Sequence, residues 1–204
     1  NIDLLSVSAH KLHGPKGVGA LYMRKGVKMK PVMFGGHQER KMRPGTHNVP
    51  GIAGLGKAVE IAASDMEGEG EKRLRLRERL WEGIKANISH IRMNGHPTER
   101  LSNTLNISFE FVEGESLILS LDDLGICVAS GSACTSDSLE PSHVLLAMGC
   151  VPEVAHGSLR FSLGRGNTVE EIDLVIQALP KVVERMRSMS PLYREFLKKQ
   201  KEKK

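Results

Sequence analysis

The feature that most constrains the fold is a turn of two histidines and a lysine between two apolar segments. The segment "IDLLSV" precedes the turn "SAHKLHGPKG", and "GVGALYMR" follows it. Both segments are short, rich in aliphatic residues and bounded by Gly and Pro, so each predicts a β-strand. We expect the first strand to be buried and Lys11 to lie at its C-terminal end, where α/β folds place ligands.

Two interpretations of this turn follow from the residues alone. Partial burial at a strand end would lower the pKa of Lys11 and make its amine a nucleophile suited to a Schiff base with an aldehyde cofactor. Ser8 and His10 could then donate hydrogen bonds to an anion beside it. The alternative is a surface turn whose Lys and His side chains are simply solvated.

The rest of the chain predicts an α/β part followed by a mixed α+β part. Residues 33–51 form a long loop without periodicity, and such loops in compact domains are usually functional or disordered. Residues 52–91 carry apolar residues at spacings of three and four, which predicts helices, with Gly68 and Gly70 marking a point of bending or breakage.

The mixed part is expected to end in a long helix. Thr168 and Glu171 form a capping-box pattern at its start, and Pro180 is expected to kink it. The predicted elements before it are a strand at 104–112, a helix at 113–125, a strand at 126–130, a helix at 142–149 and a strand at 157–165.

The three cysteines indicate one reactive thiol. The cysteines are odd in number and lack CxxC spacing; they are Cys127, Cys134 and Cys150. We therefore expect neither a disulfide framework nor a bound metal, and the pattern suits a reducing cytoplasm. Cys127 and Cys150 fit the usual buried, inert cysteine. Cys134 lies instead in "SGSACTS", whose small residues predict an exposed loop.

Two further residues could bind anions. Arg160 interrupts the apolar strand "LRFSLGR", which favours two-point capture of a carboxylate, although an internal ion pair explains it equally well. Thr46 follows Arg43 in "RPGT", which suits either a phosphate site or a plain turn.

The charge pattern argues against nucleic acid as a partner. Of the net charge of +5, the tail "KKQKEKK" contributes +4, and a solvated, fraying end explains it most simply. No apolar segment approaches the ~18 residues that span a membrane, so we expect no membrane contact. The chain begins at Asn1, directly at a predicted core strand, which suggests a piece of a longer chain.

Taken together, these motifs resemble the cysteine desulfurases, pyridoxal-phosphate enzymes that supply sulfur to iron–sulfur cluster assembly. The resemblance spans nearly the whole chain, in the family's order. The matching stretches are "SAHKLHGPKGVGALY", "GGHQERKMRPGTHNVPGIAGLGKA", "SNTLNISF", "SGSACTSDSLEPSHVLLAMG", "RFSLGR" and "SPLY".

This resemblance implies an α/β fold, the C-terminal half of a fold-type I, aminotransferase class V-like enzyme. Residues 1–62 would end the large cofactor-binding domain, residues 63–197 would form the small C-terminal domain, and residues 198–204 would be a basic tail. The missing N-terminal half would come from a longer parent or a companion chain.

The resemblance also implies roles for the cofactor residues. Lys11 would hold pyridoxal 5'-phosphate and later move the substrate α-proton. Ser8 and His10 would bind the cofactor phosphate, and Thr46 would reach the phosphate of the neighbouring subunit in a homodimer.

The sulfur residues would act on L-cysteine. Arg160 would bind the substrate carboxylate, and Cys134 would attack the substrate sulfur, giving alanine and an enzyme persulfide for an iron–sulfur scaffold protein. Cys134 could also contact an iron–sulfur cluster transiently.

Two alternatives remain open at this point. The fragment could be a docking module for a scaffold protein without chemistry, or a related selenocysteine lyase, against which the Cys134 loop argues. One departure from the family is His37, which stands where a third Gly is usual in "GGHQER".

Overall fold

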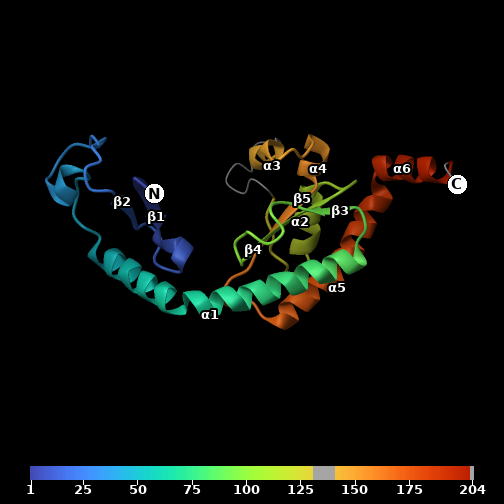
Figure 1. Ribbon diagram of the computed structural model, residues 1–204, viewed down its shortest axis with the longest axis horizontal. Coiled ribbons are helices and arrows are strands. Elements are labelled where there is room, and N and C mark those ends of the chain that lie inside the picture. The colour runs from blue at the N-terminus through green and yellow to red at the C-terminus, as the bar shows by residue number, and fades with distance from the viewer. Residues whose placement is uncertain (131–140, 203–204) are drawn as a thin grey trace. The chain divides into compact units, whose positions relative to one another are not determined.

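The structure is a computed structural model that describes residues 1–130 and 141–202. The chain divides into two compact units, Asn1–Gly68 and Glu69–Lys204, and each is described by itself. Helix α1, Val49–Asn87, begins in the first unit and ends in the second (Figure 1).

The first unit is built on the predicted hairpin. Strands β1, Leu4–Ser8, and β2, Gly19–Met23, pair antiparallel, with Ser8 opposite Gly19. Gly19 is required there, because a Cβ at this position would lie 2.5 Å from the carbonyl oxygen of Val7. The short helices η1, Ala9–Leu12, and η2, Gln38–Lys41, complete the unit.

The expected burial of the first strand is wrong for the described residues. Leu4 and Leu5 are 45% and 46% exposed, and all of β2 is exposed. The physical reason is that this unit buries few apolar residues, namely Ala9, Leu55 and Ala58, and none of them belongs to either strand.

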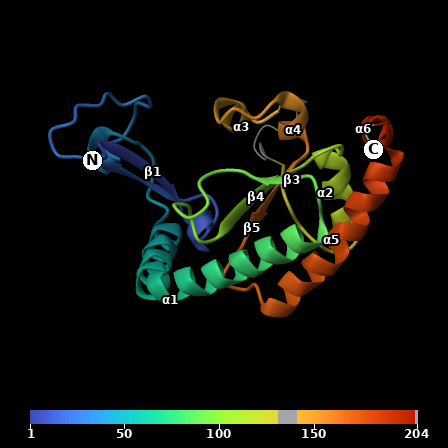
Figure 2. The same cartoon turned by 45° about the vertical axis from the view of Figure 1, so that its right-hand side comes forward.

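The second unit is a three-stranded antiparallel sheet with an apolar core on one face. The strand order is β3–β4–β5, with β3 at Ile91–Met93, β4 at Thr104–Phe109 and β5 at Ser158–Ser162. Alternate residues of β4 and β5 point into the core, where the C-terminal part of α1, helix α2 (Gly114–Asp122) and helix α5 (Val169–Met189) cover them. Figures 1 and 2 both show α1 and α5 side by side along the sheet. The fully buried apolar residues of the strands are Leu105, Ile107, Phe109 and Leu159.

Several predicted elements are confirmed. The capping box between Thr168 and Glu171 is complete. Helix α5 continues past Pro180, and the kink expected there stays a prediction. Helix α1 likewise runs unbroken through Gly68 and Gly70, so a break there is excluded, and the bend that the two glycines also allow stays a prediction. The strand predicted at 126–130 is reduced to a single bridge between Ala129 and Arg160.

Besides the short helices η1 and η2, three elements have no counterpart in the sequence predictions. These are β3, the short helix α4 at Pro152–His156 and helix α6 at Pro191–Lys201. The Ser190 side chain accepts from the Tyr193 N–H at the start of α6, so residues expected to be a solvated tail are helical as far as Lys201. Helix α3, at His143–Ala147, was predicted. No helix in the described ranges has the length and apolar character needed to cross a membrane.

Candidate active site

The Lys11 turn is tied to the hairpin by backbone hydrogen bonds. Ala9 at its start is fully buried, and its N–H donates to the Val18 carbonyl at 3.1 Å. The Gly14 N–H donates to the Ala9 carbonyl at 2.9 Å, and His13, with φ 61°, ends the turn in the left-handed region. The backbone that carries Lys11 is therefore fixed at both ends.

Small residues let this turn pack closely against α1. A Cβ on Gly14 would lie 3.2 Å from the Ala58 Cβ, and a Cβ on Gly54 would lie 2.6 Å from the Pro15 ring. A larger side chain at either glycine would push the turn away from the helix. The Lys11 turn therefore packs directly against the first part of α1.

The side chains of this turn face outward. Ser8 is half-buried, and His10 and Lys11 are exposed, so the expected burial of Lys11 is not found in the described residues. The donor set nevertheless fits pyridoxal phosphate. It offers an amine for the aldehyde, and a hydroxyl and an imidazole as donors for the phosphate.

The loop that carries Thr46 is held by its own polar contacts. The Gly45 N–H donates to Gln38 Oε1 at 3.2 Å, and Gly45 adopts a φ of 104°, which favours glycine. Arg43 donates to the Pro44 carbonyl at 2.6 Å. Thr46 is exposed, and no hydrogen bond joins it to Ser8, His10 or Lys11 within the described residues. Its reach toward a neighbouring subunit stays a prediction.

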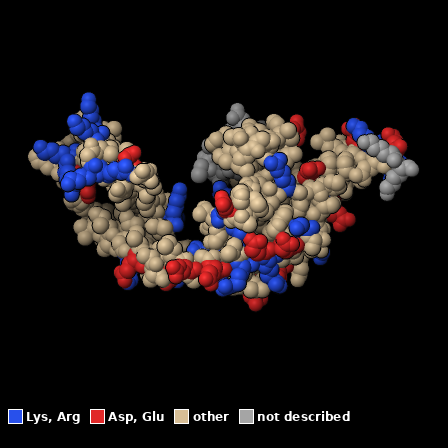
Figure 3. All heavy atoms as spheres, viewed as in Figure 1, with Lys and Arg blue, Asp and Glu red and all other residues tan. Residues whose placement is uncertain are grey.

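Positive charge is concentrated around this loop, a feature that the sequence predictions did not include. Between Arg24 and Arg43 there are seven Lys or Arg residues and one Glu, although the chain without its tail is nearly neutral overall. Figure 3 shows blue side chains gathered over the loop that follows β2. Such a field favours a phosphate-bearing ligand.

Arg160 lies in the second unit with an unused donor. Its backbone N–H and C=O bond to Ala129 at 2.7 and 3.2 Å, and its side chain is half-buried. The Nε atom is buried and has no hydrogen-bond partner. Within the described residues Arg160 forms no ion pair, and its role as a carboxylate-binding residue stays a prediction.

The predictions for the three cysteines have different outcomes. Cys150 is buried, as expected, and its Sγ donates to Asn94 Oδ1 at 3.6 Å. Cys127 is exposed, so the prediction that it packs in the core is wrong. The reason is that residues 126–130 form only one bridge to β5, which leaves Cys127 outside the sheet core. Cys134 lies outside the described residues.

Residues 1–175 match the aminotransferase class-V family. The chain belongs to this family. Enzymes of the aminotransferase class-V family that resemble this chain depend on pyridoxal phosphate. The donor set of the Lys11 turn agrees with that cofactor.

Curated relatives within this family carry the name expected from the sequence. A cysteine desulfurase IscS of Methanosarcina thermophila is 57% identical over 94% of this chain and 47% of its own length. An IscS of Clostridium botulinum is 53% identical over the full chain and 52% of its own length. The chain therefore spans about half the length of these relatives, and its resemblance to cysteine desulfurases is confirmed.

Solved structures confirm the expected α/β fold. A NifS-like protein shares 38% identity and a TM-score of 0.80 over 90% of this chain and 47% of that chain. A NifS-like protein from Rickettsia africae shares 31% identity and a TM-score of 0.81 over 90% of this chain and 48% of that chain. The agreement extends across most of the described elements of both units.

Proposed function

We propose that this chain is the C-terminal part of a pyridoxal-phosphate-dependent cysteine desulfurase. The observation that carries the proposal is the Lys11 turn, where an exposed amine, an exposed imidazole and a half-buried hydroxyl lie within four residues on a backbone fixed against α1. The names of the relatives and the Arg160 Nε atom, which is buried without a hydrogen-bond partner among the described residues, support it.

The chain's own residues would divide the work as follows. Lys11 holds the cofactor and moves a proton at the substrate Cα, while Ser8, His10 and Thr46 bind the phosphate. Pyridoxal phosphate, when bound, supplies the electron sink that stabilises a substrate carbanion. The positive charge between Arg24 and Arg43 adds to the attraction of the phosphate.

The substrate would be held and cleaved by the remaining residues. Arg160 binds the carboxylate of L-cysteine. The Cys134 thiolate attacks the substrate sulfur, so that an S–S bond forms and the Cβ–S bond breaks. The substrate carbon skeleton takes up a proton and leaves as alanine, and Cys134 is left as a persulfide.

The finer context of the enzyme is part of the proposal. We infer a homodimer in which Thr46 serves the neighbouring subunit, an iron–sulfur scaffold protein as sulfur acceptor, and a cytoplasmic location. An N-terminal half, from the same or a companion chain, completes the cofactor site.

The Lys11 assignment is tested in the complete enzyme. Lys11→Ala should abolish alanine formation from L-cysteine and also the cofactor linkage that borohydride fixes to protein. Lys16→Ala, five residues along the same exposed turn region, is the matched control and should retain both. A borohydride-fixed linkage that persists in Lys11→Ala would refute the assignment.

A further inference from the structure

The sheet face opposite the core carries a row of polar side chains across all three strands. Asn106 of β4 lies opposite Arg160 of β5. On the β3 side of β4, Met93 lies opposite Ile107, so the residue after it, Asn94, lies opposite Asn106. The Asn94 N–H donates to the Asn106 carbonyl at 2.9 Å. Side chains directly opposite each other share a face. Asn94, Asn106 and Arg160 therefore form one row.

Asn106 and Arg160 are the closely spaced kind of cross-strand pair. The backbone N–H and C=O of Arg160 both bond to Ala129, on the side of β5 away from β4. Toward β4 the residue is thus in a non-hydrogen-bonded position, where opposing side chains approach most closely. Both side chains are half-buried, so a small ligand can reach them.

Asn94 decides which end of the Asn106 amide points outward. Asn94 is 3% exposed, and its Nδ2 donates to Asn106 Oδ1 at 2.7 Å and to Ser108 Oγ at 2.8 Å. Its Oδ1 accepts from the Cys150 thiol. Because Asn106 Oδ1 is occupied, its Nδ2 is the free end, and no hydrogen bond joins that nitrogen to another described residue.

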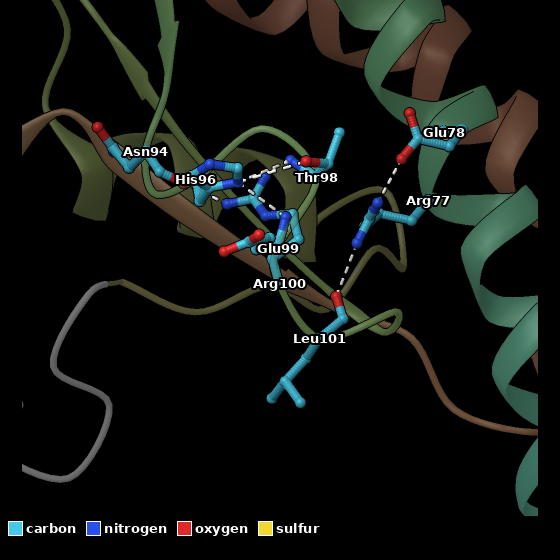
Figure 4. Close-up of polar contacts among 8 residues, drawn as sticks. All are labelled: Arg77, Glu78, Asn94, His96, Thr98, Glu99, Arg100 and Leu101. Carbon is cyan, nitrogen blue, oxygen red and sulfur yellow. Dashed lines mark hydrogen bonds and ion pairs between the residues drawn. The ribbon is translucent and has the colours of Figure 1, made fainter.

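Arg100 holds the backbone of Asn94. Figure 4 shows the Arg100 guanidinium reaching the backbone of Asn94, whose carbonyl accepts from Arg100. The buried Arg77 has other partners: it donates to the Leu101 carbonyl at 2.7 Å and pairs with Glu78. Asn94 is therefore fixed both through its side chain and through its backbone.

We propose that Asn106 is a second carboxylate-binding residue, whose Nδ2 donates to the same carboxylate as Arg160. Both groups offer donors, and a carboxylate only accepts. The buried Arg160 Nε has no hydrogen-bond partner. The Asn106 side-chain oxygen does not accept from it, because that oxygen accepts from Asn94. Asn94 is then a positioning residue. The inference rests on the proposed function, in that the carboxylate is that of the amino-acid substrate.

The test uses the complete enzyme and L-alanine, which has the substrate's carboxylate but no sulfur to lose. The reporter is the Arg160 Nε–H resonance, followed by NMR during the titration. We expect a saturable shift in the wild-type enzyme. Asn106→Ala should weaken binding about 10- to 100-fold, the effect of losing one hydrogen bond to a charged group.

Two variants separate the donor from mere packing. Asn106→Asp keeps the shape but sets a carboxylate beside Arg160, so binding should be lost. Asn106→Ser keeps a shorter donor and should fall between wild type and Asn106→Ala. Thr104→Val, on the same face of β4, is the matched control and should bind as wild type does.

The outcomes distinguish this inference from the proposed function. Unchanged affinity in Asn106→Ala, or no Arg160 shift in the wild-type enzyme, overturns the role of Asn106 and leaves the Lys11 test unaffected. The opposite result is also possible: L-alanine binding depends on Asn106, but the complete enzyme forms no alanine from cysteine. In that case Asn106 is a carboxylate-binding residue, and the proposed desulfurase activity is wrong.

Discussion

Arg79 of α1 and Asp173 of α5 form a two-point ion pair. Arg79 Nε lies 2.6 Å from Asp173 Oδ1, and a second guanidinium nitrogen lies 2.8 Å from Oδ2. The hydrogen bonds from Arg79 lower the pKa of Asp173. This pair links the two helices that pack side by side against the sheet of the second unit (Figure 2).

The Arg79–Asp173 pair predicts a pH-dependent contribution to stability. Because the folded-state pKa of Asp173 is below its unfolded value of about 3.9, the stabilisation is present above that pH and is lost as the pH falls through the folded pKa. Asp173→Asn should therefore lower the unfolding midpoint at pH 5–7, and the difference from wild type should vanish on acidification. Urea unfolding at several pH values measures this.

Glu184→Gln is the control for that experiment. Glu184 is an exposed carboxylate of the same helix. Its removal should leave the pH profile unchanged. A difference between Asp173→Asn and wild type that stays constant down to pH 2 would contradict the assigned titration.

Arg187 of α5 predicts a larger loss of stability. It is 5% exposed and donates to the carbonyls of Ser89, His90 and Glu110, and its burial lowers its pKa. Arg187→Met would leave these acceptors without a donor. Because each buried unsatisfied group costs about 1–3 kcal/mol, we expect a loss of roughly 2–4 kcal/mol in the free energy of unfolding.

The neighbouring Arg185 offers a matched control for Arg187. It is exposed on the same helix, so Arg185→Met should change stability by less than ~0.5 kcal/mol. Equal losses from both variants, measured by denaturant unfolding, would show that the carbonyl contacts of Arg187 contribute nothing.

Substitution of each of the three cysteines should affect a different measured property. In the complete enzyme, Cys134→Ser should stop persulfide formation yet leave cofactor absorbance and cysteine binding largely intact. Cys127→Ser should be neutral, because Cys127 is exposed, whereas Cys150→Ser should reduce stability, because Cys150 is buried against Asn94. Persulfide labelling and thermal unfolding distinguish these effects. Persulfide formation at an undiminished level in Cys134→Ser would remove its role.

Substitution of Arg160 should weaken the binding of cysteine more than the binding of the cofactor. Charge-assisted hydrogen bonds contribute about 1.5–3 kcal/mol each, so Arg160→Ala should weaken cysteine binding about 100-fold or more. Arg160→Lys keeps the charge but loses the planar fork, and should show an intermediate defect. Titration of the cofactor absorbance with cysteine measures both. If Arg160→Ala bound cysteine normally, another arginine, with Arg165 the next candidate, would hold the carboxylate.

Local sequence signals were sufficient for much of the fold. The β1–β2 hairpin follows from two short apolar segments around a Gly- and Pro-rich turn, and the start of α5 follows from Thr168 and Glu171. Each of these signals acts between residues close in the chain, so it needs no knowledge of packing. The candidate residues Ser8, His10 and Lys11 share one short turn for the same reason.

Only the tertiary structure decided which residues meet across the sheet and which are covered. The alternation in "TLNISF" puts Asn106 on the polar face, but the choice of Asn94 and Arg160 as its neighbours depends on strand register between distant segments. The exposure of Cys127 and of β1 likewise depends on which apolar surfaces lie nearby. A side chain's own sequence neighbours determine its direction from the backbone, whereas its burial and its partners are determined by what packs against it.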